Sequence, residues 1–181
     1  VHAAKLTTGE DVVIKVQKPG VETILYTDLN VVHWAAKLLE RAVPKIKFAA
    51  LSDIVDEIKT RMVREVDFIE EAQNLDDFVE YLNISQNQAA TAPKVYHQFS
   101  TRRVLTMQRL YGVPLTDFSV VKQYAKDPSQ VLITAMNTWF GSLMLCKSFH
   151  ADLHAGNLML LEDGRVGFID FGIVGQLKPE V

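Results

Sequence analysis

One polar segment near the end of the chain constrains the fold more than any other feature. Residues 149–172 read FHADLHAGNLMLLEDGRVGFIDFG, and they set two histidines, two aspartates and an asparagine among apolar and turn residues. The turn Glu162–Gly164 predicts a hairpin between the strands Asn157–Leu161 and Arg165–Ile169. That hairpin would fold Asp170 back toward Asn157, so the sequence predicts that the polar residues share one site.

Three interpretations of this segment are open. His150 and His154 are four residues apart, as zinc ligands are on a helix, but Gly156 and the loop-like composition argue against a helix there. An ordinary polar turn followed by a chance Asp-Phe-Gly tripeptide is the second interpretation. The third is a phosphoryl-transfer site, and it accounts for the largest number of residues at once.

Phosphoryl transfer needs a carboxylate near the attacking oxygen, oxygen ligands for magnesium and positive charge along the phosphates. Asp152 is suited to orient an acceptor hydroxyl or water. Asn157 and Asp170 supply a neutral and an anionic oxygen to the same metal, and we expect Gly172 to adopt an unusual backbone angle just after that ligand. The pattern His-x-Asp-x-x-x-x-Asn followed by Asp-Phe-Gly matches the protein-kinase signature.

The first half of the chain offers the positive charge. Lys15 is a single cation in the otherwise apolar strand VVIKV, where burial is costly unless the ammonium is paired. We predict that a helix carboxylate pairs with it, with Glu71 as first choice and Glu70 as fallback. Asp67 and Glu71 are four residues apart and share a helix face. The alternatives are a lysine that points to solvent from an edge strand and acids that form a solvated helix face.

The hydrophobic pattern predicts an α+β fold in two lobes. Residues 1–109 would form a small lobe of strands, an inserted helix and the Glu71-bearing helix, residues 110–114 a hinge, and residues 115–181 the start of a large lobe. The expected strands are Val1–Leu6, Asp11–Val16, Lys94–Phe99 and Arg103–Arg109, and the expected helices are Glu22–Ala42, one long helix from an N-cap at Ser52 to Leu82, and Pro128–Ser148.

Composition excludes some classes of function. A net charge of −3 without a basic run predicts no nucleic-acid partner. Cys146 is the only cysteine, which excludes intramolecular disulfides and Cys-rich zinc sites. Residues 128–146 carry no charge, and their polar members favour a buried core helix over a membrane span. The chain starts without Met or a targeting segment, which is typical of a piece of a longer protein.

With these motifs in view, the chain resembles the UbiB-type atypical kinase family, the ubiquinone-biosynthesis kinase-like proteins. The resemblance rests on four stretches: Ile14–Gly20 (IKVQKPG), Glu65-Val66-Asp67, Glu71-Ala72-x-Asn74 and the catalytic loop Phe149–Asn157. Residues 110–115 and 139–146 are most similar to a plastid subgroup of plants and algae.

The resemblance implies a kinase-like fold that binds ATP and Mg²⁺. Its implied catalytic residues are Asp152, Lys15 and His154, its nucleotide-binding residues Lys15, Glu71, Arg109, Tyr111, Asn157 and Asp170, and its metal-binding residues Asn157, Asp170, Glu65 and Asp67. It also implies a role in isoprenoid-quinone or prenyl-lipid metabolism in a plastid or mitochondrion. The partners would be quinone or prenyl lipids and lipid-biosynthesis enzymes, with peripheral membrane association.

The family's Ala-rich nucleotide loop, its N-terminal extension and the rest of the large lobe are absent from the 181 residues. Two other functions stay open. A small-molecule kinase of the aminoglycoside or choline type also carries His-x-Asp-x-His-x-x-Asn, although the upstream Pro-Gly and Glu-x-Asp features favour the UbiB type. The non-enzymatic alternative is a nucleotide-gated module that binds lipids or partner enzymes.

Overall fold

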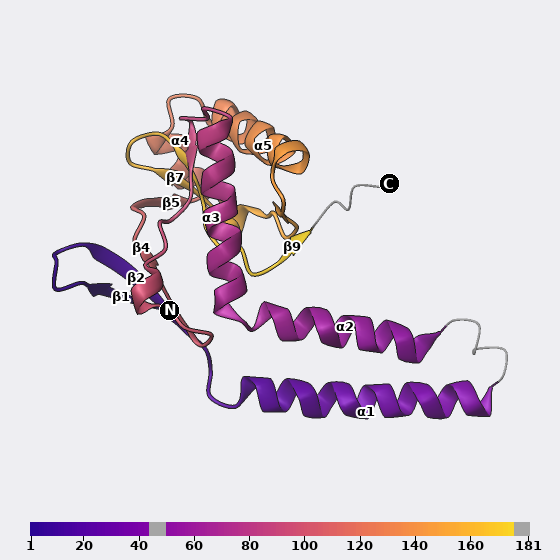
Figure 1. Cartoon of the computed structure of the whole chain (residues 1–181). Helices are drawn as coiled ribbons and strands as arrows, with labels where there is room; N and C mark the ends of the chain where they lie inside the picture. Colours follow the sequence, from indigo (N-terminus) through magenta and orange to yellow (C-terminus); the bar gives the residue numbers. More distant parts are fainter. Residues whose placement is uncertain (44–49, 176–181) are drawn as a thin grey trace. The chain divides into compact units, whose positions relative to one another are not determined.

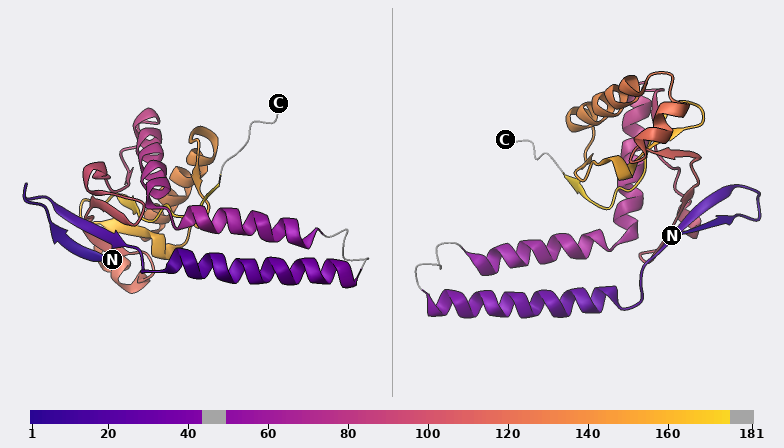
Figure 2. Two further views of the ribbon diagram at one scale, coloured as in Figure 1. Left: turned by 60° about the horizontal axis from the view of Figure 1, so that its bottom comes forward. Right: turned by 180° about the vertical axis from the view of Figure 1, so that it is seen from behind.

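Two compact units share the polypeptide, and the computed structural model describes residues 1–43 and 50–175. The first unit comprises Val1–Lys15 and Phe68–Val181, and the second comprises Val16–Asp67. The side chains of Arg64 and Glu65 lie outside the described part. Figures 1 and 2 trace the elements of each unit from indigo at the N-terminus to yellow near the C-terminus. The predicted lobes about a hinge at 110–114 stay a prediction.

The predicted N-terminal hairpin is present. Strand β1 (His2–Lys5) pairs antiparallel with β2 (Asp11–Val16), with Ala3 opposite Val13. Gly9, at φ +101°, supplies the left-handed residue of the turn. Strand β4 (Val104–Gln108) completes the sheet on the other side of β2, so β2 is the central strand. A lysine on β2 is therefore not on an edge strand, and Lys15 needs a partner above or below the sheet.

A second sheet presents the predicted C-terminal hairpin. Its strand order is β3 (Ala90–Thr91), β8 (Val166–Phe168), β7 (Leu158–Leu161) and β5 (Gly112–Pro114). Leu158 lies opposite Phe168 in the antiparallel β7–β8 pair, which is the register that returns the chain to the site. A short third sheet pairs β6 (Phe149–His150) with β9 (Val174–Gly175).

Two strand predictions need correction. The expected break over Leu110–Pro114 contains β5, where a Cβ at Gly112 would lie 2.2 Å from the Leu160 carbonyl oxygen, so only glycine permits that pairing. The expected strand Lys94–Phe99 is instead a single bridge from Val95 to Met107 followed by a 3₁₀ turn at His97–Phe99. Short polar bonds hold this turn, including one that Thr106 Oγ1 donates to the Phe99 carbonyl at 2.7 Å.

The prediction of one long helix from Ser52 to Leu82 is wrong, because two helices occupy this range. Helix α2 spans Leu51–Glu65 and α3 spans Phe68–Ile84. Groups distant in sequence satisfy the backbone at the break: Gln17 Nε2 donates to the Val66 carbonyl at 2.6 Å, and the Phe68 N–H donates to the Arg102 carbonyl at 3.1 Å. Each bond replaces one that a continuous helix would make internally. Contacts between residues distant in sequence therefore break the helix, although the hydrophobic periodicity predicted that it would continue.

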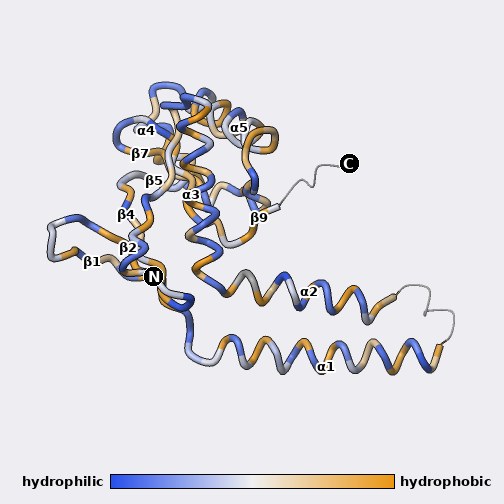
Figure 3. Tube along the Cα trace, viewed as in Figure 1, coloured by the Kyte–Doolittle hydropathy of each residue, from blue (hydrophilic) through white to orange (hydrophobic). Residues whose placement is uncertain are grey.

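Helices α1 (Val21–Ala42) and α2 lie side by side as an antiparallel pair in the second unit (Figures 1 and 2). Glu40 of α1 accepts hydrogen bonds from the Ser52 N–H at 2.8 Å and the Ser52 hydroxyl at 3.1 Å. Ser52 is therefore inside α2 rather than at its N-cap. Hydropathy along both helices alternates between apolar and polar residues (Figure 3), as amphipathic helices require.

The core of the first unit forms where α3 packs on the second sheet and on helix α5 (Pro128–Leu145), which follows the short helix α4 (Phe118–Tyr124). Its largest fully buried side chains include Phe78, Phe168 and Phe171. Tyr81 of α3 donates to the Thr138 carbonyl of α5 at 2.9 Å, and a Cβ at Gly141 would lie 2.4 Å from the Tyr81 hydroxyl. Small residues on α5 thus set how closely the two helices approach.

We expected the uncharged segment to form a buried core helix, but only part of α5 is buried. Its buried residues are the small ones, Ala135, Thr138 and Ser142, whereas large apolar side chains such as Phe140 and Met144 are 53% and 81% exposed. The small residues face α3 because only they permit close packing, which turns the larger ones outward. Within the described ranges, no helix has the length and apolarity that a membrane crossing requires.

Candidate functional site

Lys15 lies between two carboxylates in the first unit. Its Nζ atom is 2.5 Å from Glu71 Oε1 and 3.4 Å from Asp170 Oδ1. The Lys15 side chain is 15% exposed and that of Glu71 is 5% exposed, whereas Asp170 is half-exposed. The fold therefore brings one cation and two anions together across 155 residues of sequence: Lys15 from strand β2, Glu71 from helix α3 and Asp170 from the end of the β7–β8 hairpin.

The helix partner of Lys15 is the first-choice residue Glu71, and the fallback Glu70 is exposed. On α3 the buried positions include Glu71, Asn74, Leu75 and Phe78, which recur at helical spacing and place Glu71 on the core face. Burial raises the pKa of the Glu71 carboxyl above its usual value, while the Lys15 ammonium opposes that shift. Each member of this buried ion pair stabilises the other, because removal of either Lys15 or Glu71 would leave a buried charge without its partner.

The loop that follows β6 presents Asp152 to solvent. His150 is fully buried, and its Nδ1 accepts a hydrogen bond from the Asp152 N–H at 3.2 Å. Asn157 Nδ2 donates to the Asp152 carbonyl at 3.0 Å, which ties the two ends of the loop together. Trp139 Nε1 of α5 donates to the His150 carbonyl at 2.7 Å. The backbone of Asp152 is thus held on both sides while its side chain is 51% exposed.

The predicted catalytic residue His154 lies on the same loop and is exposed. Its Nδ1 accepts from the Gly156 N–H at 3.0 Å, and its Nε2 lies 3.7 Å from Asp152 Oδ2. The intervening residues are not helical, so His150 and His154 do not form the helical pair of a zinc site. Over residues 1–43 and 50–175, no group of three or more His, Cys, Asp or Glu side chains is arranged to hold a metal ion.

The β7–β8 hairpin returns Asp170 to the neighbourhood of Asn157, since the Ile169 N–H donates to the Asn157 carbonyl at 2.9 Å. The prediction of an unusual backbone angle at Gly172 is wrong, because the left-handed residue is Asp170 itself, with φ +103°. The Gly172 N–H instead donates to Asp170 Oδ1 at 3.2 Å. A non-glycine residue in this conformation is strained and persists only where its surroundings fix it.

Two further residues of the expected site, Arg109 and Tyr111, contact each other. Arg109 stacks 4.9 Å from the centre of the Tyr111 ring, and the Tyr111 hydroxyl donates to Asp11 at 2.9 Å. That hydrogen bond lowers the pKa of Asp11 and raises that of Tyr111. The side chain of Glu65 lies outside the described part of the chain, and Asp67 belongs to the second unit. Their predicted metal-binding role stays a prediction.

Sequence reasoning missed the contributions of Asn74 and Trp139. Asn74 Nδ2 donates to the Phe171 carbonyl at 3.1 Å in a buried contact, and Trp139 supports the loop before Asp152. A signal for Asn74 was available, because a polar residue on the apolar face of a helix, one turn after Glu71, requires a buried partner. Trp139 gave no such signal in an apolar helix.

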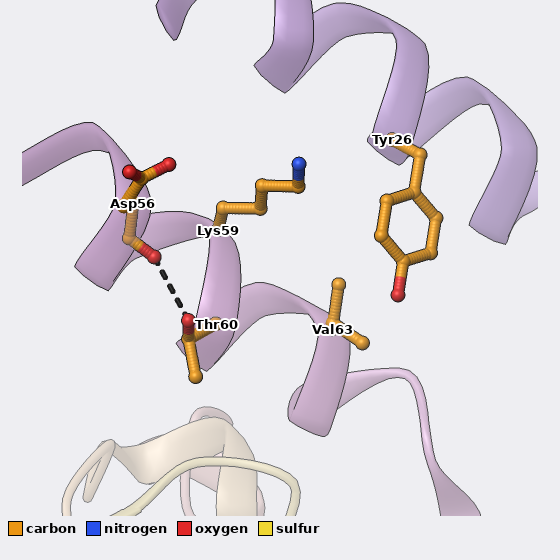
Figure 4. A pocket seen from close by; sticks show the side chains of 5 residues that line it. All are labelled: Tyr26, Asp56, Lys59, Thr60 and Val63. Carbon is orange, nitrogen blue, oxygen red and sulfur yellow. Dashed lines mark hydrogen bonds between the residues drawn. The ribbon is translucent and has the colours of Figure 1, made fainter. Parts of the chain in front are cut away.

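An open pocket lies between α1 and α2 in the second unit, and Figure 4 shows its lining: Tyr26, Asp56, Lys59, Thr60 and Val63. Its polar groups already have partners. Lys59 Nζ donates to Asn30 at 2.7 Å, and Thr60 Oγ1 donates to the Asp56 carbonyl of its own helix at 2.9 Å. None of the residues predicted for the site lines this pocket.

Comparison with known proteins gives a consistent result. The chain is 52% identical over 182 residues to an aarF domain-containing protein kinase of Arabidopsis thaliana named as chloroplastic, and 33% identical over 184 residues to the probable protein kinase UbiB of Azotobacter vinelandii. Each alignment covers 99% of this chain but 34% of the relative, so the chain spans about a third of their length.

A solved structure shares the fold. The Rv3197 protein of Mycobacterium tuberculosis, determined with erythromycin, superposes with a TM-score of 0.71 at 28% identity over 97% of this chain and 43% of its own. The predicted kinase-like α+β fold is therefore confirmed. A family model, the ABC1 atypical kinase-like domain, matches residues 1–181. With its lysine, helix glutamate and Asp-Phe-Gly aspartate assembled in one place, the chain belongs to the ABC1 atypical kinase-like family.

Proposed function

We propose that the chain is the nucleotide-binding part of an ATP-dependent atypical kinase or ATPase of the UbiB type. One observation carries the proposal: Lys15 Nζ lies within 3.4 Å of both the Glu71 and the Asp170 carboxylates. Glu71 is buried and fixes the lysine, whereas Asp170 is half-exposed and can turn toward a ligand. This arrangement leaves a positioned ammonium for phosphate oxygens and an anion for a cation.

The oxygen donors fit Mg²⁺. Asp170 offers a carboxylate, and the amide nitrogen of Asn157 is committed to the Asp152 carbonyl, which leaves Oδ1 as the amide atom for a cation. Mg²⁺ usually takes one or two protein oxygens together with phosphate and water, so a site without a third acidic side chain suits it. When bound, the ion would neutralise charge on the phosphates.

Asp152 has the position of the group that receives a proton. Its carboxylate is half-exposed while its backbone is fixed by His150 and Asn157. In the proposed reaction an acceptor hydroxyl or water attacks the γ-phosphorus, its proton passes to Asp152, and the bond to the bridging oxygen breaks to release ADP. His154, 3.7 Å from Asp152, would keep that carboxylate oriented.

A role in isoprenoid-quinone or prenyl-lipid metabolism is part of the proposal. It is supported by relatives named UbiB and by the resemblance of the Glu65–Asp67 and Ile14–Gly20 motifs to UbiB-type proteins. A plastid location is supported by two Arabidopsis relatives named as chloroplastic. Prenyl lipids and the enzymes that make them would then be the partners, at a membrane surface.

The decisive experiment measures ATP hydrolysis and phosphate transfer by the full-length protein with Mg²⁺, alone and with vesicles that contain quinone-like lipids. The UbiB-type function predicts turnover that these lipids alter and that Asp152→Asn reduces by roughly 10²–10⁴-fold. Transfer to an aminoglycoside or choline would establish the small-molecule kinase instead. Tight binding of Mg²⁺-ATP without any turnover would establish a nucleotide-gated binding module.

A further inference from the structure

Helix α3 holds Phe171 of the Asp-Phe-Gly segment at two points. Asn74 and Phe78 lie four residues apart on the face of the helix that carries Glu71, and they contact the Phe171 carbonyl and the Phe171 ring. We call these two contacts the Phe171 grip. All three residues of the grip are buried in the first unit.

The first contact of the grip involves the Phe171 backbone. Asn74 Nδ2 donates to the Phe171 carbonyl at 3.1 Å in a buried contact. The carbonyl cannot leave without exposing an unpaired polar atom in a buried place, which is costly.

The second contact fixes the ring. The Phe78 and Phe171 ring centres are 4.8 Å apart, and His150 approaches the same ring edge-on at 5.0 Å. Phe171 is 1% exposed. A rotation of the Asp-Phe-Gly segment would therefore have to remove this ring from the core together with its backbone bonds.

The Phe171 grip lies next to Asp170, a residue with a strained backbone conformation. Asp170 directly precedes Phe171 and has the left-handed φ of +103°, which a side-chain-bearing residue keeps only when its neighbours dictate it. In this conformation the Asp170 carboxylate reaches Lys15 at 3.4 Å. Fixing the Phe171 carbonyl restrains the backbone that aims the Asp170 carboxylate.

We propose that Asn74 is a positioning residue that, through the Phe171 carbonyl, holds Asp170 in the conformation required to bind Mg²⁺ beside Lys15. This inference rests on the proposed function for its use of Mg²⁺. Asn74 does not touch the ligand. Its hydrogen bond joins two segments into one rigid element. One is α3, which carries Glu71, the partner of Lys15, and the other is the segment that carries Asp170. Lys15 and the metal ligand Asp170 therefore keep their relative positions.

The test compares two variants of the full-length protein that each lose one buried hydrogen bond from α3 to a backbone carbonyl. Asn74→Leu loses the bond to Phe171, and Tyr81→Phe, the matched control, loses the bond to Thr138 on α5. Amide hydrogen exchange at Phe171 and Gly172 is measured without nucleotide. We expect it to be about tenfold faster in Asn74→Leu, as loss of one buried hydrogen bond implies, and unchanged in Tyr81→Phe.

The second readout is the Mg²⁺ concentration that half-saturates binding of a fluorescent ATP analogue. We expect it to rise about tenfold in Asn74→Leu, while the affinity measured in EDTA and the Mg²⁺ dependence of Tyr81→Phe stay as in the wild type. If Asn74→Leu does not fold, Asn74→Ser, which is too short to reach Phe171, replaces it.

The outcomes separate the two proposals. Wild-type exchange at Phe171 in the Asn74 variant, or an unchanged Mg²⁺ dependence, overturns the role of Asn74. If the wild-type protein shows no Mg²⁺-dependent nucleotide binding, the proposed function fails, and the exchange rates still decide whether Asn74 holds Phe171.

Discussion

Lys15 Nζ lies 2.5 Å from Glu71 Oε1, and both side chains are shielded from solvent. Neither charge is tolerable alone in this position, because an unpaired buried charge costs several kcal/mol. The pair is therefore a mutual requirement of strand β2 and helix α3. That makes the contact testable by stability as well as by activity.

The first prediction concerns this pair. Lys15→Ala should lower the free energy of unfolding by about 3–5 kcal/mol, since it leaves the Glu71 carboxylate buried and unpaired. Glu71→Ala should lower it by less, since Lys15 keeps Asp170 at 3.4 Å. The double variant should be little worse than Lys15→Ala, because the second substitution removes the orphaned charge. Urea denaturation of all four proteins checks this. Additive losses in the double variant would mean that the two residues do not stabilise each other.

The second prediction concerns Asp170. Asp170→Asn should weaken Mg²⁺-dependent nucleotide binding by roughly tenfold or more, because an anionic ligand to a hard cation is lost. Calorimetric titration with and without Mg²⁺ measures it. Asp163→Asn is the control, since Asp163 is an equally exposed aspartate that pairs with Arg165 in the β7–β8 turn. An unchanged Mg²⁺-dependent affinity in Asp170→Asn would count against the assignment.

The third prediction concerns Asp152. Asp152→Asn should reduce ATP turnover by roughly 10²–10⁴-fold if the carboxylate receives the proton. Nucleotide affinity should change little, because the backbone bonds from Asp152 to His150 and Asn157 do not depend on the side chain. Turnover and binding are measured on the same preparation. Equal losses of both would show that the residue is structural.

The fourth prediction concerns pH. Burial lowers the pKa of His150 below its usual 6.5, because Nδ1 must stay unprotonated to accept from the Asp152 N–H and the ring has no access to water. The unfolded chain then binds the proton more readily than the folded one. The stability linked to His150 is complete above pH 6.5 and is lost as the pH falls toward the lowered value, by up to about 1.4 kcal/mol per pH unit.

The measurement is the free energy of unfolding of wild-type and His150→Asn proteins between pH 5 and 7.5. Asparagine keeps an acceptor but does not titrate, so the difference in stability between the two proteins should shrink as the pH falls. A difference that is constant with pH would show that His150 titrates alike in the folded and unfolded chains.

Most of the elements that depend on residues near in sequence were predicted correctly. The hairpin β1–β2, helix α1 and the β7–β8 hairpin follow from alternation, helical spacing and turn residues near in sequence. The first-choice partner of Lys15, Glu71, is the one that faces the core, and the fallback Glu70 is exposed, since two adjacent helix residues point in different directions. These features depend on interactions within a few residues.

The rest depended on partners that are distant in sequence. The helix break at Val66–Asp67 exists because Gln17 and Arg102 satisfy its backbone, and no window of local sequence contains both. The left-handed residue is Asp170 rather than Gly172, and the carbonyl of the next residue, Phe171, accepts a hydrogen bond from Asn74, 97 positions earlier in the sequence. The sequence alone determined which residues are candidates for the chemistry. Tertiary packing decided their backbone angles and burial, because buried polar groups take whichever partner the folded chain brings within reach.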